Sequence, residues 1–410
     1  MVKILLVVVL IGILIIIHEF GHYLMAKILK VDVAVFSIGF GPSILEKKIS
    51  GTLFKLSIIP LGGYVKLCED DKDPIEYLQE KPSVYKFLIS FAGPFSNILF
   101  GFILLFFTYS IVGITDLPNA PIYKISGFKK VKKGDVIIEI DGIKVRTWSD
   151  INKLLSSSKF HKIKVCRGKD TFSFYDTLSQ DWSIYPCFTP VIGKVLKGSP
   201  AEKAGIKRFD IIVGIENKPI KCWFEAVDII KKSPERPLAF KILRGKDTIK
   251  LKVIPQKVEI DGKNLGQIGV YLLLPNYKYS FFKSLEISFN KAINGLFLIA
   301  RSLKNVILQK RFKEIGGPVM IGKVMVESMS WGLDKFLILF AFISLNLAFI
   351  NLLPLPALDG SYIIYSIIEI LFRRKISPKV LRYIQLIGLI VLFTLGLFLI
   401  FWDIFRVFFK

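Results

Sequence analysis

Four long apolar stretches stand out along this chain of 410 residues. Each offers about the 20 residues that a helix needs to cross the hydrocarbon core of a bilayer. The pattern therefore predicts a polytopic α-helical membrane protein with four transmembrane helices. A composition that is 52% hydrophobic agrees with this class. The predicted spans lie at residues 2–27, 84–113, 333–353 and 381–402.

A fifth apolar stretch, residues 281–310, also has a helical period but is interrupted by charges. That many charges favour an amphipathic helix at the membrane interface over a fifth span. A fifth span would also move residues 354–360 to the opposite side of the membrane from His22, and the chemistry below needs the two together. The charged residues of the stretch are Lys283, Glu286, Lys291, Arg301 and Lys304.

The distribution of Lys and Arg predicts the orientation in the membrane. The short segment 366–382 between the last two spans is strongly basic, which favours the cytoplasmic side. Four spans then place residues 28–83 inside and 114–332 outside. The first span should be retained and not cleaved as a signal peptide, because Leu24-Met25-Ala26 has leucine where cleavage needs a small residue. The basic residues of the segment are Arg373, Arg374, Lys375, Lys379 and Arg382.

The formal net charge of +24 raises the possibility of a nucleic acid partner. No stacking-aromatic or Gly-rich RNA motif accompanies the charge, so we expect no nucleic acid and assign the excess to loops and to surfaces that face the bilayer. The four cysteines lack the spacing of a zinc knuckle. One disulfide among Cys166, Cys187 and Cys222 is compatible with the sequence, and its pairing stays open.

Residues 36–67 have strand character, with Gly and Pro between the apolar positions. Two interpretations remain open: a cytoplasmic hairpin, or a β-loop that re-enters the membrane beside an active site. Non-helical backbone at membrane depth needs protein or a water-filled cavity to cover it.

An internal repeat organises the predicted outer region. Residues 134–140 are echoed by 209–215, and Arg167-Gly168-Lys169-Asp170-Thr171 by Arg244-Gly245-Lys246-Asp247-Thr248. The repeat predicts two β-rich modules. The second, with Gly198-Ser199-Pro200-Ala201, resembles a bacterial PDZ domain, a fold that binds extended peptides. The first module lacks that stretch and the second has Phe209 where the PDZ pattern has glycine, so peptide binding and steric filtering are both open.

The candidate chemistry begins with His18-Glu19-Phe20-Gly21-His22 at the end of the first span. Residues i and i+4 share a helix face, so both imidazoles can reach one metal ion, and Glu19 stands where a general base belongs. The chain has only three histidines, and charged or metal-binding groups in an apolar span are costly and usually functional. We therefore expect a zinc site.

Zinc needs a third protein ligand and an open position for water. Asp359 follows Pro354 and Pro356 at the end of the third span. Taken alone, it reads as a cap of the next helix, predicted at 361–372. Asn346 and Asn351 just before this break favour a site, because broken helices at membrane depth usually mark one. His18, His22 and Asp359 are the predicted ligands.

These motifs together resemble the site-2 protease family of intramembrane zinc metalloproteases, most closely its bacterial regulator of sigma-E protease group. Phe91-Ala92-Gly93-Pro94-Phe95-Ser96-Asn97, residues 36–67 and Gly317-Pro318 also look like segments of that family. The resemblance implies zinc as cofactor and Glu19 as the catalytic residue. It makes 36–67 the membrane-reentrant β-loop of the family. The substrate-binding residues that it implies are Asn351, Pro354, Ile58, Gly62 and Gly63.

The resemblance also implies a function: cleavage of the transmembrane segments of single-span proteins, such as anti-sigma factors or remnant signal peptides, in regulated intramembrane proteolysis. It places the chain in a bacterial inner membrane, in contact with lipid and a substrate helix, with the PDZ-like modules on the periplasmic or extracytoplasmic side and the active site near the cytoplasmic side. The alternative is a non-enzymatic membrane-anchored PDZ adaptor.

The predicted organisation follows from these segments. It comprises 1–30 (first span with the HEFGH motif), 31–83 (β-loop), 84–113 (second span), 114–184 and 185–258 (PDZ-like modules), 259–332 (amphipathic region), 333–360 (third span with Leu358-Asp359-Gly360), 361–380 (short cytoplasmic helix and loop) and 381–410 (fourth span and C-terminus).

Overall fold

The structure, a computed structural model, describes residues 2–68, 73–145, 147–156, 159–260, 263–309 and 316–409. The chain forms two compact units. The membrane unit comprises Met1–Ile114 and Lys278–Lys410, and the β-rich unit comprises Thr115–Tyr277.

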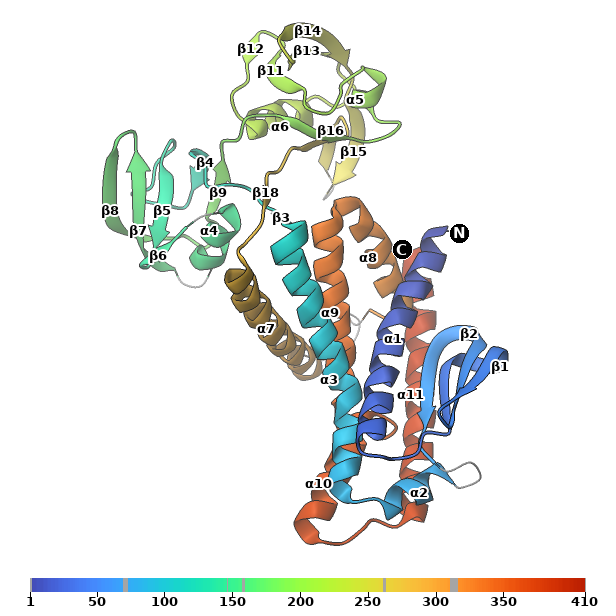
Figure 1. Ribbon diagram of the computed structural model, residues 1–410. Helices are drawn as coiled ribbons and strands as arrows, with labels where there is room; N and C mark the ends of the chain where they lie inside the picture. Colours follow the sequence, from blue (N-terminus) through green and yellow to red (C-terminus); the bar gives the residue numbers. More distant parts are fainter. Residues whose placement is uncertain are drawn as a thin grey trace. The chain divides into compact units, whose positions relative to one another are not determined.

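Long apolar helices build the membrane unit (Figure 1). Within the described residues, four helices are long and apolar enough to cross a membrane, at 6–28, 83–112, 333–351 and 378–403. These helices coincide with the four predicted spans. Helix α3 is the central element, because it packs against α1, α9 and α10. The bounds are α1 Val2–Ile28, α3 Ser83–Phe107 with a π-helical turn Thr108–Val112, α9 Leu333–Asn351, α10 Asp359–Phe372 and α11 Pro378–Phe409.

A buried ion pair joins α3 to the end of α10. Lys86 donates to Glu369 and to Gln79 in α2 (Pro74–Glu80), and Ser83 also donates to Glu369. Burial would raise the pKa of the Glu369 carboxyl, but these hydrogen bonds, with one from the backbone N–H of Ile376, lower it. The network holds α10 against α3, and α10 begins at Asp359.

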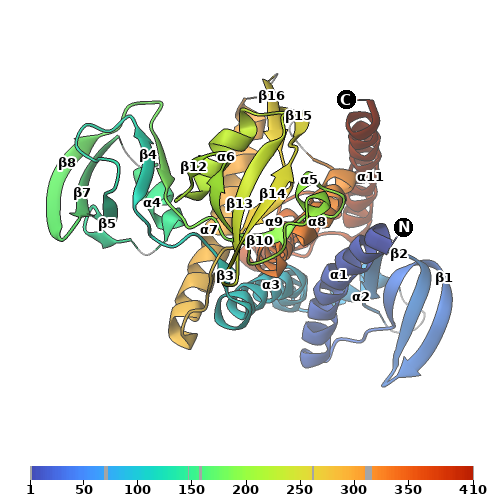
Figure 2. The ribbon, with the colours of Figure 1, turned by 90° about the horizontal axis from the view of Figure 1, so that it is seen from above.

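The segment 36–67 forms an antiparallel hairpin of β1 (Val35–Ile49) and β2 (Thr52–Lys66). The first residues of β1 pair on both sides, because Val35 lies opposite both Leu53 and Lys66. The last part of β2 therefore forms an outer strand. This hairpin packs along α1, as both ribbon views show (Figures 1 and 2).

Two further helices, α7 (Phe281–Leu308) and α8 (Pro318–Trp331), complete the membrane unit. Helix α7 packs against α3 and α9, and its assignment as an interfacial helix stays a prediction. Asp403 of α11 is fully buried and accepts hydrogen bonds from Gly317 N and Met320 N at 3.1 and 2.9 Å, which caps the start of α8. The outward side of α7 carries an apolar stripe of Phe282, Leu285, Phe289, Ile293 and Phe297.

The β-rich unit contains two similar modules, each with a four-stranded antiparallel sheet, ordered β6-β5-β7-β8 and β12-β11-β13-β14. The first module has β4 Ile122–Ser126, β5 Val136–Ile140, β6 Ile143–Lys144, α4 Trp148–Leu155, β7 Phe160–Arg167, β8 Asp170–Thr177 and β9 Ser183–Pro186. The second has β10 Ile192–Val195, α5 Pro200–Lys203, β11 Ile211–Ile215, β12 Lys218–Pro219, α6 Trp223–Lys231, β13 Leu238–Arg244, β14 Asp247–Val253, β15 Gln256–Ile260, β16 Lys263–Gln267 and β17 Val270–Leu272; β3 Ile114–Thr115 and β18 Asn276–Tyr277 lie at the ends of the unit.

Equivalent buried ion pairs mark the repeat. Asp135 accepts from Arg167 in the first module, and Asp210 accepts from Arg244 in the second. The turns that precede β5 and β11 also match, because Gly134 and Phe209 both have a positive φ, 90° and 71° respectively. Phe209 stands where the PDZ pattern has glycine, and its backbone adopts a conformation that favours glycine.

Two predictions about this unit change. The second module does not end at residue 258: β17 pairs with β10, and Ile268 is buried in the same core, so the module continues to Leu272. Such a pairing joins residues far apart in sequence and leaves no local pattern. The open disulfide pairing is resolved as Cys187–Cys222, and Cys166 is free.

Candidate active site

The two histidines of the first span face the same interior point. His18 and His22 are both buried, and their Nε2 atoms lie 3.3 Å apart. Their i, i+4 spacing on α1 produces this arrangement. Gly93 of α3 makes room for the second ring, because a Cβ there would lie 2.2 Å from His22 Nε2. Close packing of α1 on α3 therefore sets the position of the imidazoles.

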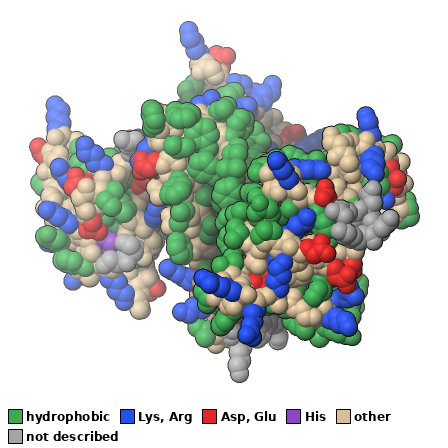
Figure 3. Space-filling model, turned by 60° about the horizontal axis from the view of Figure 1, so that its bottom comes forward, with side chains coloured by type: hydrophobic (Ala, Val, Ile, Leu, Met, Phe, Trp, Pro, Cys, Tyr) green, Lys and Arg blue, Asp and Glu red, His purple; other side chains and the backbone are tan. Residues whose placement is uncertain are grey.

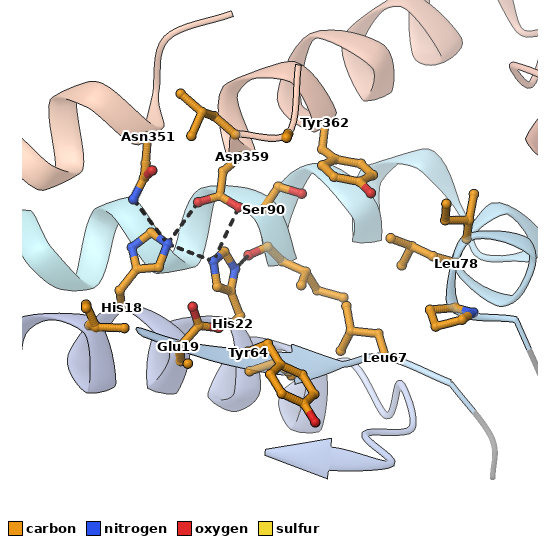
Figure 4. Close-up of a pocket in the computed structure, with 18 of the residues that line it drawn as sticks. His18, Glu19, His22, Tyr64, Leu67, Leu78, Ser90, Asn351, Asp359 and Tyr362 are labelled. Atoms are coloured by element: carbon orange, nitrogen blue, oxygen red, sulfur yellow. Dashed lines mark hydrogen bonds and ion pairs between the residues drawn. The ribbon is translucent and has the colours of Figure 1, made fainter. Parts of the chain in front are cut away.

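Asp359 reaches the histidines because the chain turns sharply between α9 and α10. Ala357 adopts a positive φ of 69°, and a Cβ on Gly360 would lie 2.2 Å from the Leu353 carbonyl oxygen, so only glycine fits. Leu358 holds the cap position of α10 and makes no side-chain capping bond. The alternative in which Asp359 serves as a helix cap is therefore wrong, and its carboxylate is free to face the imidazoles (Figure 4).

The distances among these three side chains fit a zinc ion. Asp359 Oδ2 lies 3.0 Å from His18 Nε2, and Oδ1 lies 3.4 Å from His22 Nε2. Zinc–ligand bonds of about 2.0–2.2 Å in a tetrahedron separate ligand atoms by roughly 3.3–3.6 Å. The His18–His22 and His22–Asp359 separations lie in this range, and the His18–Asp359 separation is slightly shorter. Two imidazoles and a carboxylate are also the donors that catalytic zinc prefers. Among the described residues, His18, His22 and Asp359 form the group of potential ligand side chains that could hold a metal ion.

A cavity of about 530 Å³ opens beside the cluster, and Glu19 lines it. Figure 4 shows the Glu19 carboxylate directed toward the two imidazoles. The outer strand of β2 forms one wall through Gly63, Tyr64 and Val65. A water molecule and an extended peptide segment therefore have space between the ligand cluster and a strand.

The structure separates the predicted substrate-binding residues into two groups. Asn351 and Gly63 line the cavity, and Asn351 Nδ2 lies 3.4 Å from His18 Nε2. Ile58 is 58% exposed on β2, Gly62 faces the ring of Phe40, and Pro354 lies in the break after α9; none of these three lines the cavity. Their roles stay predictions.

Several residues at the site were not singled out from the sequence. Ser90 and Tyr362 line the cavity. Asn97 of α3 is fully buried with its Nδ2 3.3 Å from His18 Nδ1. The signal for Asn97 was available, since it is a polar residue within an apolar span.

Comparison with known proteins agrees with this geometry. The model of peptidase family M50 matches residues 6–395. The "Regulator of sigma-E protease RseP" of Escherichia coli is 28% identical, covering 94% of both chains, and the protein of the same name from Salmonella typhimurium is 29% identical over the same shares. A protein of Borreliella burgdorferi named "Putative zinc metalloprotease" is 33% identical, covering 94% of this chain and 95% of its own.

The family model covers nearly the whole chain, and the relatives align along almost their full lengths. This decides between the enzyme and the non-enzymatic adaptor in favour of the enzyme. The chain belongs to peptidase family M50, the site-2 proteases, and is a zinc metalloprotease with apolar helices suited to a membrane.

Proposed function

We propose that this protease cleaves the transmembrane segments of single-span membrane proteins inside the bilayer. The observation that carries the proposal is the convergence of His18, His22 and Asp359 from separate helices of an apolar helical unit. In this proposal these three side chains hold the zinc, and Glu19 is the catalytic residue. A site enclosed by membrane helices selects substrates that are themselves in the membrane.

The residues around the cavity support a hydrolytic mechanism. Bound zinc would polarise the scissile carbonyl and make a water molecule more acidic. Glu19 accepts the proton of the attacking water and passes it to the leaving amine nitrogen. Asn351 stands beside His18, where its amide N–H can donate to the substrate backbone.

A substrate helix must unwind before cleavage, because its carbonyl groups are engaged in internal hydrogen bonds. The unwound backbone then needs new partners at membrane depth. The outer strand of β2 lines the cavity through residues 63–65 and pairs with β1 along its other edge. Strand addition at this edge would satisfy the exposed backbone and position it beside Glu19.

The proposed orientation places the site near the cytoplasmic side and the β-rich unit outside the cytoplasm. Figure 3 shows Lys and Arg side chains gathered at the end of the membrane unit that comes forward. The β-rich unit contains the disulfide Cys187–Cys222, and disulfides persist in oxidising compartments outside the cytoplasm. Both observations support a bacterial inner-membrane protein with the PDZ-like modules on its outer face.

The substrates proposed are proteins whose outer domain another protease has already removed, such as anti-sigma factors or remnant signal peptides. Relatives named for regulation of sigma-E support the first class. The two PDZ-like modules would bind peptide or exclude substrates with bulky ectodomains.

Substitution of Glu19 by Gln tests the proposal. The purified variant in lipid vesicles should cleave a model transmembrane peptide at least about 10²-fold more slowly than the wild type, while its zinc content stays unchanged. Equal cleavage rates would refute the role of Glu19. Cleavage mapped only to sites outside the apolar segment would refute intramembrane proteolysis.

A further inference from the structure

The ring nitrogens that face away from the ligand cluster are both directed at α3. His22 Nδ1 lies 2.7 Å from the backbone carbonyl oxygen of Ile89. A carbonyl oxygen only accepts, so His22 Nδ1 carries the proton and Nε2 presents its lone pair to the cluster. The backbone of α3 therefore fixes His22 in the tautomer that binds a metal through Nε2.

Asn97 occupies the equivalent place for His18. Its side chain is fully buried, and Nδ2 lies 3.3 Å from His18 Nδ1. The other amide atom, Oδ1, is buried without a hydrogen-bond partner. A buried polar atom without a partner costs about 1–3 kcal/mol, so its presence calls for an explanation.

The two orientations of the Asn97 amide have opposite chemical consequences. If Nδ2 donates to His18 Nδ1, the proton of His18 must be on Nε2, which then donates to Asp359 and cannot bind a metal. If the amide is turned by 180°, Oδ1 accepts from Nδ1–H, and Nε2 presents its lone pair to the cluster. The amide oxygen and nitrogen can be exchanged without altering the shape of the side chain.

Packing alone does not explain an asparagine at this position. The bond that joins α3 to α9 here runs from Ser344 Oγ to the backbone carbonyl of Asn97, at 2.8 Å. Any residue at position 97 would provide that carbonyl. The amide of the Asn97 side chain is instead hydrogen-bonded to His18.

We propose that Asn97 is the positioning residue of His18: its Oδ1 accepts the Nδ1–H bond and holds the imidazole in the zinc-binding tautomer. The inference rests on the proposed assignment of His18 as a ligand. It assigns α3 the task of fixing both histidines, through the Ile89 carbonyl for one and the Asn97 amide for the other.

Two substitutions of Asn97 separate an acceptor from a donor. Asn97→Asp keeps an oxygen acceptor and loses the donor, whereas Asn97→Leu loses both at similar volume. Zinc affinity, measured by competition with a chelator, should fall about 10–100-fold in the leucine variant and stay at or above the wild-type value in the aspartate variant. Ser344→Ala serves as the packing control and should leave zinc affinity unchanged.

Wild-type affinity in Asn97→Leu would overturn the inference. Loss of zinc in Asn97→Asp would also overturn it, because that result is expected if Asn97 must donate. The aspartate variant therefore tests the inference even if the leucine variant does not fold. His18→Ala separates the role of Asn97 from the assignment of His18 as a ligand. Zinc loss in His18→Ala with wild-type affinity in Asn97→Leu refutes only the role of Asn97, whereas full zinc retention in His18→Ala refutes the ligand assignment beneath it.

Discussion

Both units of this protein bury a histidine against an aspartate, and the surroundings of the two aspartates differ. In the β-rich unit, Asp141 lies 2.6 Å from His161 Nδ1 and also accepts from the backbone N–H of Lys162. His161 Nε2 in turn lies 3.3 Å from the Leu155 carbonyl oxygen. In the membrane unit, the partners of Asp359 among the described residues are the two imidazoles.

The difference supports the proposal that the cluster in the membrane unit is a metal site, whereas the pair in the β-rich unit is structural. Asp135 and Asp210 each accept two bonds from an arginine and one from a backbone N–H. The carboxylate oxygens of Asp135 and Asp210 are thus engaged in hydrogen bonds that stabilise turns and strands. Asp359, His18 and His22 instead direct their acceptor atoms at one another, an arrangement that a cation stabilises.

The largest expected effect is on zinc binding, and it should be confined to the membrane unit. Asp359→Asn replaces the carboxylate of a proposed ligand by a neutral amide, so most of the bound zinc and nearly all cleavage should be lost. Asp141→Asn is the matched control in the β-rich unit and should keep the full zinc content. Metal analysis of both purified variants checks the comparison, which fails if Asp359→Asn retains its zinc.

The next effect should be the reverse, a loss of stability without loss of zinc. Asp210→Asn leaves Arg244 beside a neutral partner, and we expect the second module to lose about 1.5–3 kcal/mol of unfolding free energy. Faster hydrogen exchange in β11 and β13 of the full-length protein would report the loss. Unchanged exchange there would show that the ion pair is not needed for stability.

Acid should weaken the β-rich unit through the same carboxylates. Burial opposes the shift, but the arginine and backbone hydrogen bonds lower the pKa of Asp135 and Asp210. Four backbone N–H bonds do the same for Asp176. Since the folded pKa values lie below the unfolded ones, this stability is present above about pH 4 and is lost as the pH falls further. Hydrogen exchange of β5 and β11 can be measured from pH 7 to pH 3 and corrected for the intrinsic effect of pH on amide exchange. The corrected rate should rise only in the acid range. A rise near neutral pH would show that these carboxylates are not the cause.

The smallest effect concerns the turn that the two modules share. Phe209 has a positive φ of 71° and is 59% exposed. Phe209→Gly should therefore stabilise the second module by about 0.5–1 kcal/mol after the greater flexibility of unfolded glycine is counted. Gly134→Ala, at the matching turn, should destabilise the first module by about 1 kcal/mol. Thermal unfolding measures both, and a destabilised Phe209→Gly would indicate that the contact between the Arg208 guanidinium and the Phe209 ring outweighs the strain.

The apolar spans and the three side chains that meet in the membrane unit could be anticipated from the sequence because both depend on strong signals. Uninterrupted apolar runs define the helices, and His18 and His22 stand in such a run at helical spacing. Asp359 carries a weaker signal, since proline and aspartate at a helix end are also typical of a cap.

The features that escaped prediction depend on packing between distant segments. Asn97 is a polar residue in an apolar span, but its position beside His18 depends on how α3 packs against α1. The pairing of Cys187 with Cys222 and the extension of the second module to Leu272 also join residues far apart in the chain. No local period of apolar residues encodes which face of a helix meets which neighbour.

We expect zinc at the cluster of His18, His22 and Asp359 in the membrane unit, and none at the pair of His161 and Asp141 in the β-rich unit. Anomalous diffraction at the zinc absorption edge, from crystals of the purified protein, tests it most directly. We expect one strong peak between His18 Nε2, His22 Nε2 and the Asp359 carboxylate, and none at His161 and Asp141. A zinc-loaded protein whose anomalous peak lies away from those three ligands would contradict it.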